Sequence, residues 1–168
     1  MDHRELDNFI ERYLNGDTSA FDIIYEETKK SVYLSIYSLI KDRSSIEDLM
    51  QDTYMKAINS LDYYQIGTNF RAWISRIARN TTINYLKKKN REDVVDPQET
   101  TIISELEDKG NLLLDQALRI LSEPEKEIIV YRIVLNYTFK EISSILNIPL
   151  GTVFWNYQRA IKKIKREL

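Results

Sequence analysis

The densest set of chemically active side chains lies between Phe70 and Arg91. This segment carries seven lysines and arginines and no acidic residue, although the whole chain has a formal net charge of −2. Its apolar residues recur at helical spacing, and the opposite face carries Arg76, Arg79, Asn80 and Lys87. Lysine and arginine neutralise phosphates, and asparagine can hydrogen-bond base edges. The segment predicts either a nucleic-acid-binding helix or a solvated basic face on a surface helix.

The loop before this helix, residues 62–69, adds aromatic side chains to the cationic surface. It contains Tyr63 and Tyr64 and ends at Asn69. Exposed aromatic rings beside basic residues are suited to stacking with unpaired bases. The alternative is that both tyrosines cover the core of the domain.

The composition excludes several kinds of site. The chain has no cysteine and a single histidine, His3, so thiolate metal sites, disulfides and histidine-based triads are not expected. We find no nucleophile–base pair and no glycine-rich phosphate loop, and we expect neither a cofactor nor an enzymatic activity. No apolar run reaches the length of a membrane span and the N-terminus lacks an apolar signal core, so we expect a cytoplasmic protein.

The charge distribution divides the 168-residue chain into blocks. Residues 1–62 hold 7 bases and 13 acids, while residues 92–113 hold one base and seven acids. Within the latter block, residues 92–109 include Pro97 and show weak periodicity, which predicts a mobile linker or a plain spacer. With only four glycines and three prolines, the chain is expected to be all-α, with two small helical domains joined by this acidic linker.

Three helices are expected before the basic segment. They cover residues 2–14, about 19–41, and about 44–61, and Ser44 with Glu47 fits a capping box for the third. The apolar residues of the third helix form one stripe from Ile46 to Leu61. Its other face carries Asp48, Gln51 and Asp52.

The C-terminal segment predicts a helix-turn-helix. Ser122 with Glu125 and Thr138 with Glu141 form two capping boxes, and Asn136 can end the helix between them in the left-handed conformation. A tight turn over residues 147–151 then leads to a final helix from about Thr152. The inward stripe of this helix runs from Val153 to Leu168, and its outward side is basic. The alternative is a plain helical hairpin.

Three stretches together resemble bacterial sigma factors of the extracytoplasmic-function (ECF) class. They are IEDLMQDTYMKAI (46–58), FRAWISRIARNTTINYLKKK (70–89) and the C-terminal segment 121–168. The resemblance implies sigma region 2 over residues 1–91, an acidic linker over 92–110 and a region 4 helix-turn-helix over 111–168. It also implies a role in promoter recognition, promoter melting and transcription initiation, with core RNA polymerase and promoter DNA as partners.

The family's division of labour assigns roles to numbered positions. Polymerase binding, through the β′ clamp helices, falls on Asp48, Gln51 and Asp52, and the second domain is expected to dock on the β flap. Binding of the single-stranded −10 element falls on Tyr63, Tyr64, Asn69, Arg76, Arg79, Asn80, Lys87 and Lys88. Binding of the duplex −35 element falls on Thr152, Trp155, Asn156, Gln158, Arg159 and Lys162.

One departure from the family pattern affects the last helix. Where the family usually places Lys-Ser-Arg after Gly-Thr-Val, this chain has Phe154, Trp155 and Asn156. Trp155 could pack on sugar or thymine methyl groups and Asn156 could read adenine, or the aromatic residues could bury against a protein partner such as an anti-sigma factor. A polymerase-independent helix-turn-helix regulator and a sigma-like interaction protein are the two alternative functions.

Overall fold

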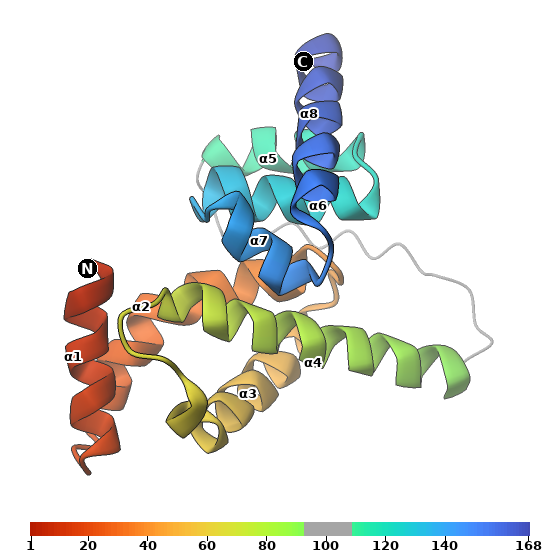
Figure 1. The fold of residues 1–168 in the computed structure, drawn as a ribbon. Coiled ribbons are helices and arrows are strands. Elements are labelled where there is room, and N and C mark those ends of the chain that lie inside the picture. The colour runs from red at the N-terminus through yellow and green to blue at the C-terminus, as the bar shows by residue number, and fades with distance from the viewer. Residues whose placement is uncertain (93–108) are drawn as a thin grey trace.

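The computed structural model describes residues 1–92 and 109–168, and every regular element within these ranges is helical. The helices form an N-terminal and a C-terminal domain, so the predicted all-α fold with two helical domains is confirmed (Figure 1). The prediction of a mobile linker falls mainly on residues 93–108, which lie outside the described ranges.

The N-terminal domain packs four helices around one core. Their bounds are α1 (His3–Leu14), α2 (Ala20–Tyr37), α3 (Arg43–Asn59) and α4 (Phe70–Glu92), with a 3-10 turn at Leu61–Tyr63 before α4. The apolar stripes predicted for α3 and α4 face this core, in which Leu49 and Ile74 are buried beside Leu6 and Ile10 of α1. Each such side chain contributes about 1.5–3 kcal/mol when it is buried.

Carboxylates begin two of these helices. Asp2 Oδ1 accepts from the Glu5 amide at 2.9 Å, and Glu5 Oε2 accepts from the Asp2 amide at 3.0 Å, which makes a capping box for α1. The predicted box of Ser44 and Glu47 is wrong. Asp42, with an extended backbone, accepts from the Ser45 amide at 3.0 Å and starts α3 at Arg43. A carboxylate placed immediately before the helix satisfies the first free amides, so Ser44 lies inside the first turn.

Helix α2 ends earlier than the sequence predicts. It stops at Tyr37 rather than near Lys41. The Ser38 hydroxyl donates to the Ser35 carbonyl at 3.0 Å, a local side-chain bond that competes with continuation of the helix.

The C-terminal domain contains four helices and one π-helical segment. Their bounds are α5 (Lys109–Arg119), α6 (Glu123–Ile129), η2 (Val130–Val134), α7 (Phe139–Leu146) and α8 (Leu150–Glu167). The capping boxes of Ser122 with Glu125 and Thr138 with Glu141 are confirmed, and Asn136 has a φ of 56°. Helix α5 was not predicted.

Helices α7 and α8 form the predicted helix-turn-helix. Asn147 ends α7 with a φ of 52°, and the Ser143 hydroxyl donates to the Ile148 carbonyl at 2.6 Å, which holds the turn. Helix α8 begins at Leu150, two residues before the predicted start. Its Val153 and Ala160 are buried, whereas Leu168, predicted to face inward, is exposed because it lies past the last helical residue.

The two domains contact each other along α4. Helix α7 lies across the first half of α4, whereas the second half of α4 extends beyond it (Figure 1). Ala72 of α4 packs into the C-terminal core with Ile142 and Ile145, and Leu34 of α2 packs with Leu118 and Val130. One face of α4 therefore lies against its own domain, while part of another lies against the second domain.

Candidate nucleic-acid interface

Arg79 of α4 is paired with a carboxylate of the C-terminal domain. Its Nε lies 2.6 Å from Glu127 Oε2 and its second guanidinium nitrogen lies 3.3 Å from Oε1. The two side chains are 19% and 6% exposed. Burial raises the pKa of Glu127 above its ordinary value, although the hydrogen bond from Arg79 opposes this rise. The guanidinium group of Arg79, which the sequence predicts to bind DNA, is thus paired with a protein carboxylate.

Two further contacts extend this pairing along the same face of α4. The hydroxyl groups of Ser75 and Tyr137 lie 2.9 Å apart, and the Asn69 side-chain amide donates to Glu141 Oε1 at 3.2 Å. Asn69 Oδ1 also accepts from the Ala72 amide at 3.2 Å, so Asn69 caps α4. Sequence reasoning placed Asn69 at the DNA surface but missed this capping role.

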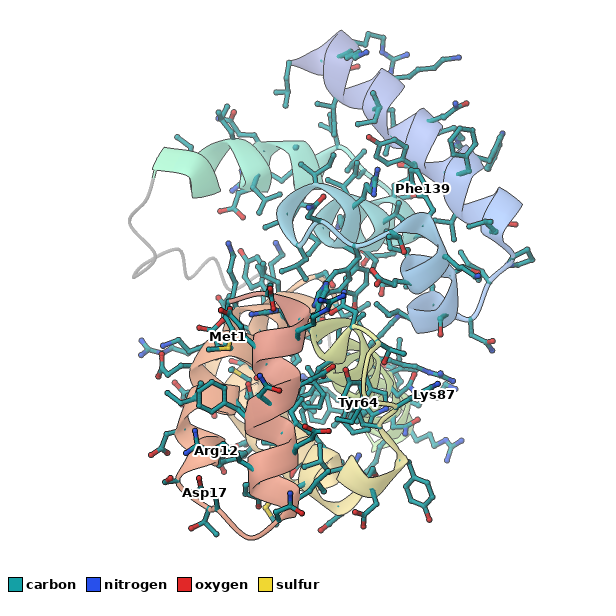
Figure 2. All side chains as sticks on the ribbon, turned by 60° about the vertical axis from the view of Figure 1, so that its left-hand side comes forward. Met1, Arg12, Asp17, Tyr64, Lys87 and Phe139 are labelled. Carbon is teal, nitrogen blue, oxygen red and sulfur yellow. The ribbon has the colours of Figure 1, made fainter. Side chains whose placement is uncertain are left out.

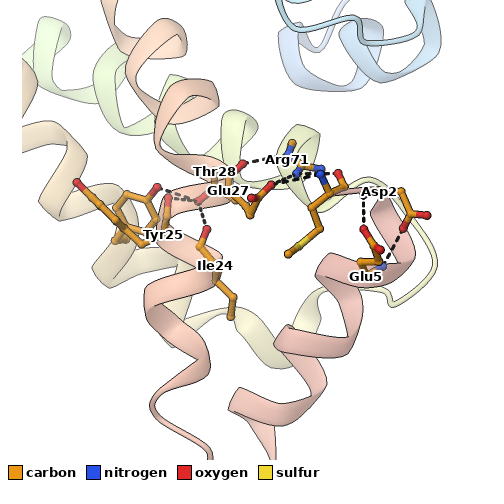
Figure 3. Close-up of polar contacts among 9 residues, drawn as sticks. Asp2, Glu5, Ile24, Tyr25, Glu27, Thr28 and Arg71 are labelled. Carbon is orange, nitrogen blue, oxygen red and sulfur yellow. Dashed lines mark hydrogen bonds and ion pairs between the residues drawn. The ribbon is translucent and has the colours of Figure 1, made fainter.

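The remaining predicted residues of α4 are open to solvent. Arg76, Asn80, Lys87 and Lys88 are exposed, and Figure 2 shows Lys87 at the edge of the molecule. Arg71 belongs to the same basic segment but has a structural role. It donates to the Glu27 carboxylate of α2 at 2.7 Å and to the carbonyl of Met1, just before α1, at 3.1 Å, which ties α4 to α2 and to the N-terminus (Figure 3).

The two tyrosines of the loop have different environments. Tyr63 is 85% exposed, as the sequence predicts for a base-stacking residue. The same prediction is wrong for Tyr64, which is 6% exposed and has its hydroxyl 2.8 Å from both Asp7 Oδ1 and the Thr68 carbonyl (Figure 2). Its ring packs on Phe70 and Trp73, which accounts for its burial. Tyr64 therefore shapes the loop from within.

An open cleft of about 380 Å³ lies beside these residues, between the start of α4 and α7. Arg76, Trp73 and Asn69 line one side and Glu141 and Ser144 line the other. The cleft marks the border between the covered and the open parts of α4.

The outer face of α3 carries the predicted polymerase-binding residues. Asp48, Gln51 and Asp52 are all exposed, opposite the buried Leu49 and Thr53. Met55 lies one turn further on the same face and is 62% exposed. Sequence reasoning missed Met55, although its position three residues after Asp52 follows the helical repeat. The face combines two carboxylates, an amide and one apolar side chain.

Helix α8 presents its predicted DNA-binding residues on the outside. Exposed side chains are those of Thr152, Trp155, Gln158, Arg159 and Lys162. The Arg159 guanidinium lies 4.6 Å from the centre of the Trp155 ring, a cation–π contact that orients both groups. This side of the helix offers cations for phosphates and an aromatic surface for apolar base edges.

The side chains of Asn156 and Phe154 are engaged by other parts of the protein, unlike the freely projecting ring of Trp155. The Asn156 side-chain amide donates to the Thr152 carbonyl at 3.0 Å, so one of its donors is engaged within the helix. Phe154 is half exposed and packs edge-on against Phe139, with ring centres 5.6 Å apart. Of the three residues that depart from the family pattern, Trp155 projects most freely.

A buried carboxylate holds α8 on the rest of its domain. Glu125 of α6 is 0% exposed, and its two oxygens accept from Lys163 Nζ at 2.8 and 3.1 Å, while Arg159 Nε lies 3.6 Å away. Burial raises the pKa of Glu125, but the hydrogen bonds from Lys163 and the Ser122 amide outweigh this effect, and the net pKa is lowered.

The comparisons with known proteins agree with this arrangement. Residues 24–92 match the family Sigma-70 region 2, and residues 111–164 match Sigma-70, region 4. The chain is 28% identical to the ECF RNA polymerase sigma factor SigW of Bacillus subtilis (strain 168) over 95% of this chain and 94% of that protein. It is also 28% identical to the ECF RNA polymerase sigma-E factor of Escherichia coli (strain K12), over 95% and 92%.

The chain is an ECF sigma factor of the sigma-70 family. The sigma factor RpoE from Bartonella quintana, solved in complex with the anti-sigma factor NepR, matches with a TM-score of 0.75 and 25% identity over 87% of this chain and 94% of that one. CnrH, solved with the cytosolic domain of CnrY, shares the fold with a TM-score of 0.70 and 19% identity over 98% and 96%.

The family assignment decides between the functions considered above. A sigma factor is a transcription initiation factor and not an enzyme, and the polymerase-independent regulator is not favoured. In the described parts of this sigma factor, no helix has the length and apolar character needed to cross a bilayer.

Proposed function

We propose that this sigma factor binds core RNA polymerase through region 2 and guides it to promoters with two basic helical surfaces. Region 2 would span residues 1–91, the linker 92–110 and region 4 residues 111–168. The protein would act in the cytoplasm, where its polymerase and promoter partners are. An anti-sigma factor is a further proposed partner, since the Bartonella relative was solved with one.

The polymerase contact is assigned to the exposed face of α3. Asp48, Gln51 and Asp52 would meet the β′ clamp helices, and Met55 would add an apolar contact at the centre of the interface. Region 4 would dock on the β flap.

The −10 contact is assigned to α4 and the exposed ring before it. Arg76, Arg79, Lys87 and Lys88 would neutralise phosphates, Asn69 and Asn80 would hydrogen-bond base edges and Tyr63 would stack on an unpaired base. Tyr64 is left out of this set because it is buried. Captured bases would offset the few kcal/mol that each unstacked base costs.

The −35 contact is assigned to the outer side of α8. Arg159 and Lys162 would bind phosphates, while Thr152, Trp155 and Gln158 would face base edges in the major groove. Asn156 would join them once its amide leaves the Thr152 carbonyl.

The observation that carries this proposal is the presence of two separate basic helical surfaces, α4 and α8, on domains that match sigma regions 2 and 4 in order. The test is run-off transcription with purified core polymerase over native genomic fragments, with and without the protein. New discrete transcripts would support the proposal and map both promoter elements. Co-elution with core polymerase without any transcript would contradict it.

Polymerase binding is tested separately by Asp48→Ala combined with Asp52→Ala. Loss of two carboxylates from the assigned face should weaken holoenzyme assembly about tenfold or more while the helical fold remains. Asp22→Ala combined with Glu26→Ala is a matched control, because it removes two exposed carboxylates from α2. Assembly at the wild-type level by the α3 variant would refute the assignment.

A further inference from the structure

A carboxylate of α1 holds the loop that precedes α4. Asp7 is 5% exposed, and its Oδ1 accepts from the Tyr64 hydroxyl while its Oδ2 accepts from the Gly67 amide, each at 2.8 Å. A buried carboxylate is costly unless hydrogen bonds replace the lost water, so these two bonds favour one conformation of the loop. Asp7 itself is fixed by its helix, because Leu6 and Ile10 of α1 are fully buried in the core of region 2.

Tyr64 extends this hold to the end of the loop. Its hydroxyl also lies 2.8 Å from the Thr68 carbonyl, so Asp7, Tyr64 and Thr68 form a chain of hydrogen-bonding groups across the loop. Burial raises the pKa of the Tyr64 hydroxyl and the bond to Asp7 adds to the rise, so the hydroxyl remains a donor at neutral pH. Gly67 has a φ of 92°, a conformation that favours glycine, and the amide of this turn is the one that Asp7 binds.

The other side of the loop carries residues that we propose read bases. Tyr63, next to the anchored Tyr64, is 85% exposed. Asn69 lines the open cleft of about 380 Å³ together with Gly67 and Thr68. The chain neighbours of both Tyr63 and Asn69 are therefore residues that α1 fastens, so a loop released from α1 would carry both side chains with it.

The phosphate-binding part of the proposed −10 site is held independently of Asp7. Arg76, Lys87 and Lys88 stand on α4, which Arg71 ties to Glu27 of α2. Phosphate contacts supply affinity and register without sequence information, whereas base contacts supply specificity. Loss of the Asp7 bonds should therefore loosen base recognition and leave phosphate binding in place.

We infer that Asp7 is a positioning residue for promoter recognition: it fixes loop 62–69 from behind and so sets how strongly the protein distinguishes the correct −10 base from an incorrect one. This inference rests on the proposed −10 role of the loop. Asp7 acts through Tyr64 and Gly67, not by contact with the strand. A preorganised loop accepts one base geometry, whereas a loose loop adapts to several and gains less from the correct base.

The test is base discrimination by holoenzyme that contains Asp7→Asn. This substitution keeps the size of the side chain but removes its charge and one of its two acceptor oxygens. Run-off transcription is measured from the mapped promoter and from versions with single-base changes in the −10 element, and the readout is the ratio of the two yields. Changes at the bases read by the loop should cost the wild type about tenfold in transcript but cost Asp7→Asn only about two- to threefold. The yield of Asp7→Asn from the unchanged promoter should fall by less than about threefold.

Two tyrosine substitutions separate positioning from general stability. Tyr64→Phe removes only the hydroxyl that links Asp7 to Thr68, so it should also lower discrimination, and combining it with Asp7→Asn should cost less than the two losses together. Tyr54→Phe is the matched control, because Tyr54 is 7% exposed and its hydroxyl lies 2.8 Å from that of Thr28 on α2 rather than from the loop. It should lower the melting temperature about as much as Tyr64→Phe without changing discrimination.

The inference is overturned if Asp7→Asn discriminates as the wild type does, or if Tyr54→Phe lowers discrimination as much as Asp7→Asn. Where circular dichroism shows that Asp7→Asn does not fold, Tyr64→Phe decides by the same ratio, and wild-type discrimination by that variant overturns the inference. These results leave the proposed function intact, because the wild-type holoenzyme still selects its −10 element. A wild-type protein that directs no transcription would instead count against the proposed function itself.

Discussion

Glu125 and Glu127 lie two residues apart on α6, and each holds one of the two helices expected to contact DNA. Glu125 pairs with Lys163 of α8 inside region 4, and Glu127 pairs with Arg79 of α4 across the domain boundary. The first carboxylate has several donors and a lowered pKa, whereas the second has one cation and a raised pKa. The carboxylate within the domain is therefore the better compensated of the two.

The two helices that we propose bind DNA, α4 and α8, differ in accessibility for the same reason. Glu125 binds Lys163 of α8, with Arg159 Nε 3.6 Å from its carboxylate, and leaves Trp155 and Lys162 on the outer side open to solvent. Glu127 instead binds the side of α4 that carries Arg79, which we propose contacts the −10 strand. Glu125 thus supports the proposed recognition surface of α8, whereas Glu127 covers part of that of α4. The two helices nevertheless show similar basic, amphipathic patterns in the sequence.

The largest expected effect concerns the helix that is covered. Arg76→Ala combined with Arg79→Ala should reduce open-complex formation about 100-fold, since each lost contact to the strand is worth about 1–3 kcal/mol. Holoenzyme assembly should stay unchanged, because both residues lie away from the α3 face. The measurement is promoter opening by permanganate footprinting, beside co-elution with core polymerase.

Arg4→Ala combined with Lys30→Ala is the control for that pair, because it removes two exposed cations elsewhere on region 2. If the α4 variant lost polymerase binding to the same extent as promoter opening, the assignment of Arg76 and Arg79 to the −10 strand would be refuted.

The next effect concerns the carboxylate that supports α8. Glu125→Gln should lower the free energy of unfolding of region 4 by about 2 kcal/mol at pH 7, somewhat below the cost for a fully buried pair. The cost lies below that of a fully buried pair because Lys163 is 30% exposed and can turn to water when its partner loses its charge. Thermal unfolding followed by circular dichroism provides the measurement, with Glu167→Gln at an exposed position as control.

The pH dependence of that effect has a defined sign. A carboxyl group whose pKa is lowered by folding contributes its stability above its unfolded value, about 4.5, and loses it as the pH falls through the lower folded value. The difference between wild type and Glu125→Gln should therefore shrink below about pH 4.5. A difference that stays constant down to pH 3 would show that the variant acts through packing instead.

The smallest expected effect distinguishes the contributions of Trp155 and its neighbour Asn156 on α8 to binding of the −35 duplex. Trp155→Ala should weaken binding of duplex −35 DNA about tenfold, because the ring is exposed and fixed by Arg159. Asn156→Ala should weaken it by only about twofold, because the Asn156 amide must first leave the Thr152 carbonyl before it can face the DNA. Fluorescence anisotropy with a labelled −35 duplex would measure both, and unchanged binding by Asn156→Ala would remove Asn156 from the proposed contact.

The positions that the sequence predicted correctly depend on short-range chemistry. The capping boxes at Ser122 and Thr138 and the left-handed Asn136 each involve residues within a few positions of one another. The prediction for Ser44 failed for a related reason, since Asp42 stands two positions earlier and its carboxylate binds the Ser45 amide, so the helix already begins at Arg43. Helix α5 was missed because the acidic composition around it indicated a linker.

Long-range contacts decided which predicted site residues are available. Tyr63 and Tyr64 are adjacent in the sequence, yet Asp7, which lies 57 residues before Tyr64, draws only the second into the core. Arg79 meets Glu127 across 48 positions.

The sequence by itself determined the helices other than α5, their apolar stripes, the helix-turn-helix and the two basic surfaces, because periodicity, capping and local charge act over a few residues. Only the tertiary structure decided that region 4 covers the first half of α4 and leaves the outer side of α8 open. The physical reason is that one helix pattern is compatible with many neighbours, and the neighbour is chosen by contacts between residues far apart in the chain.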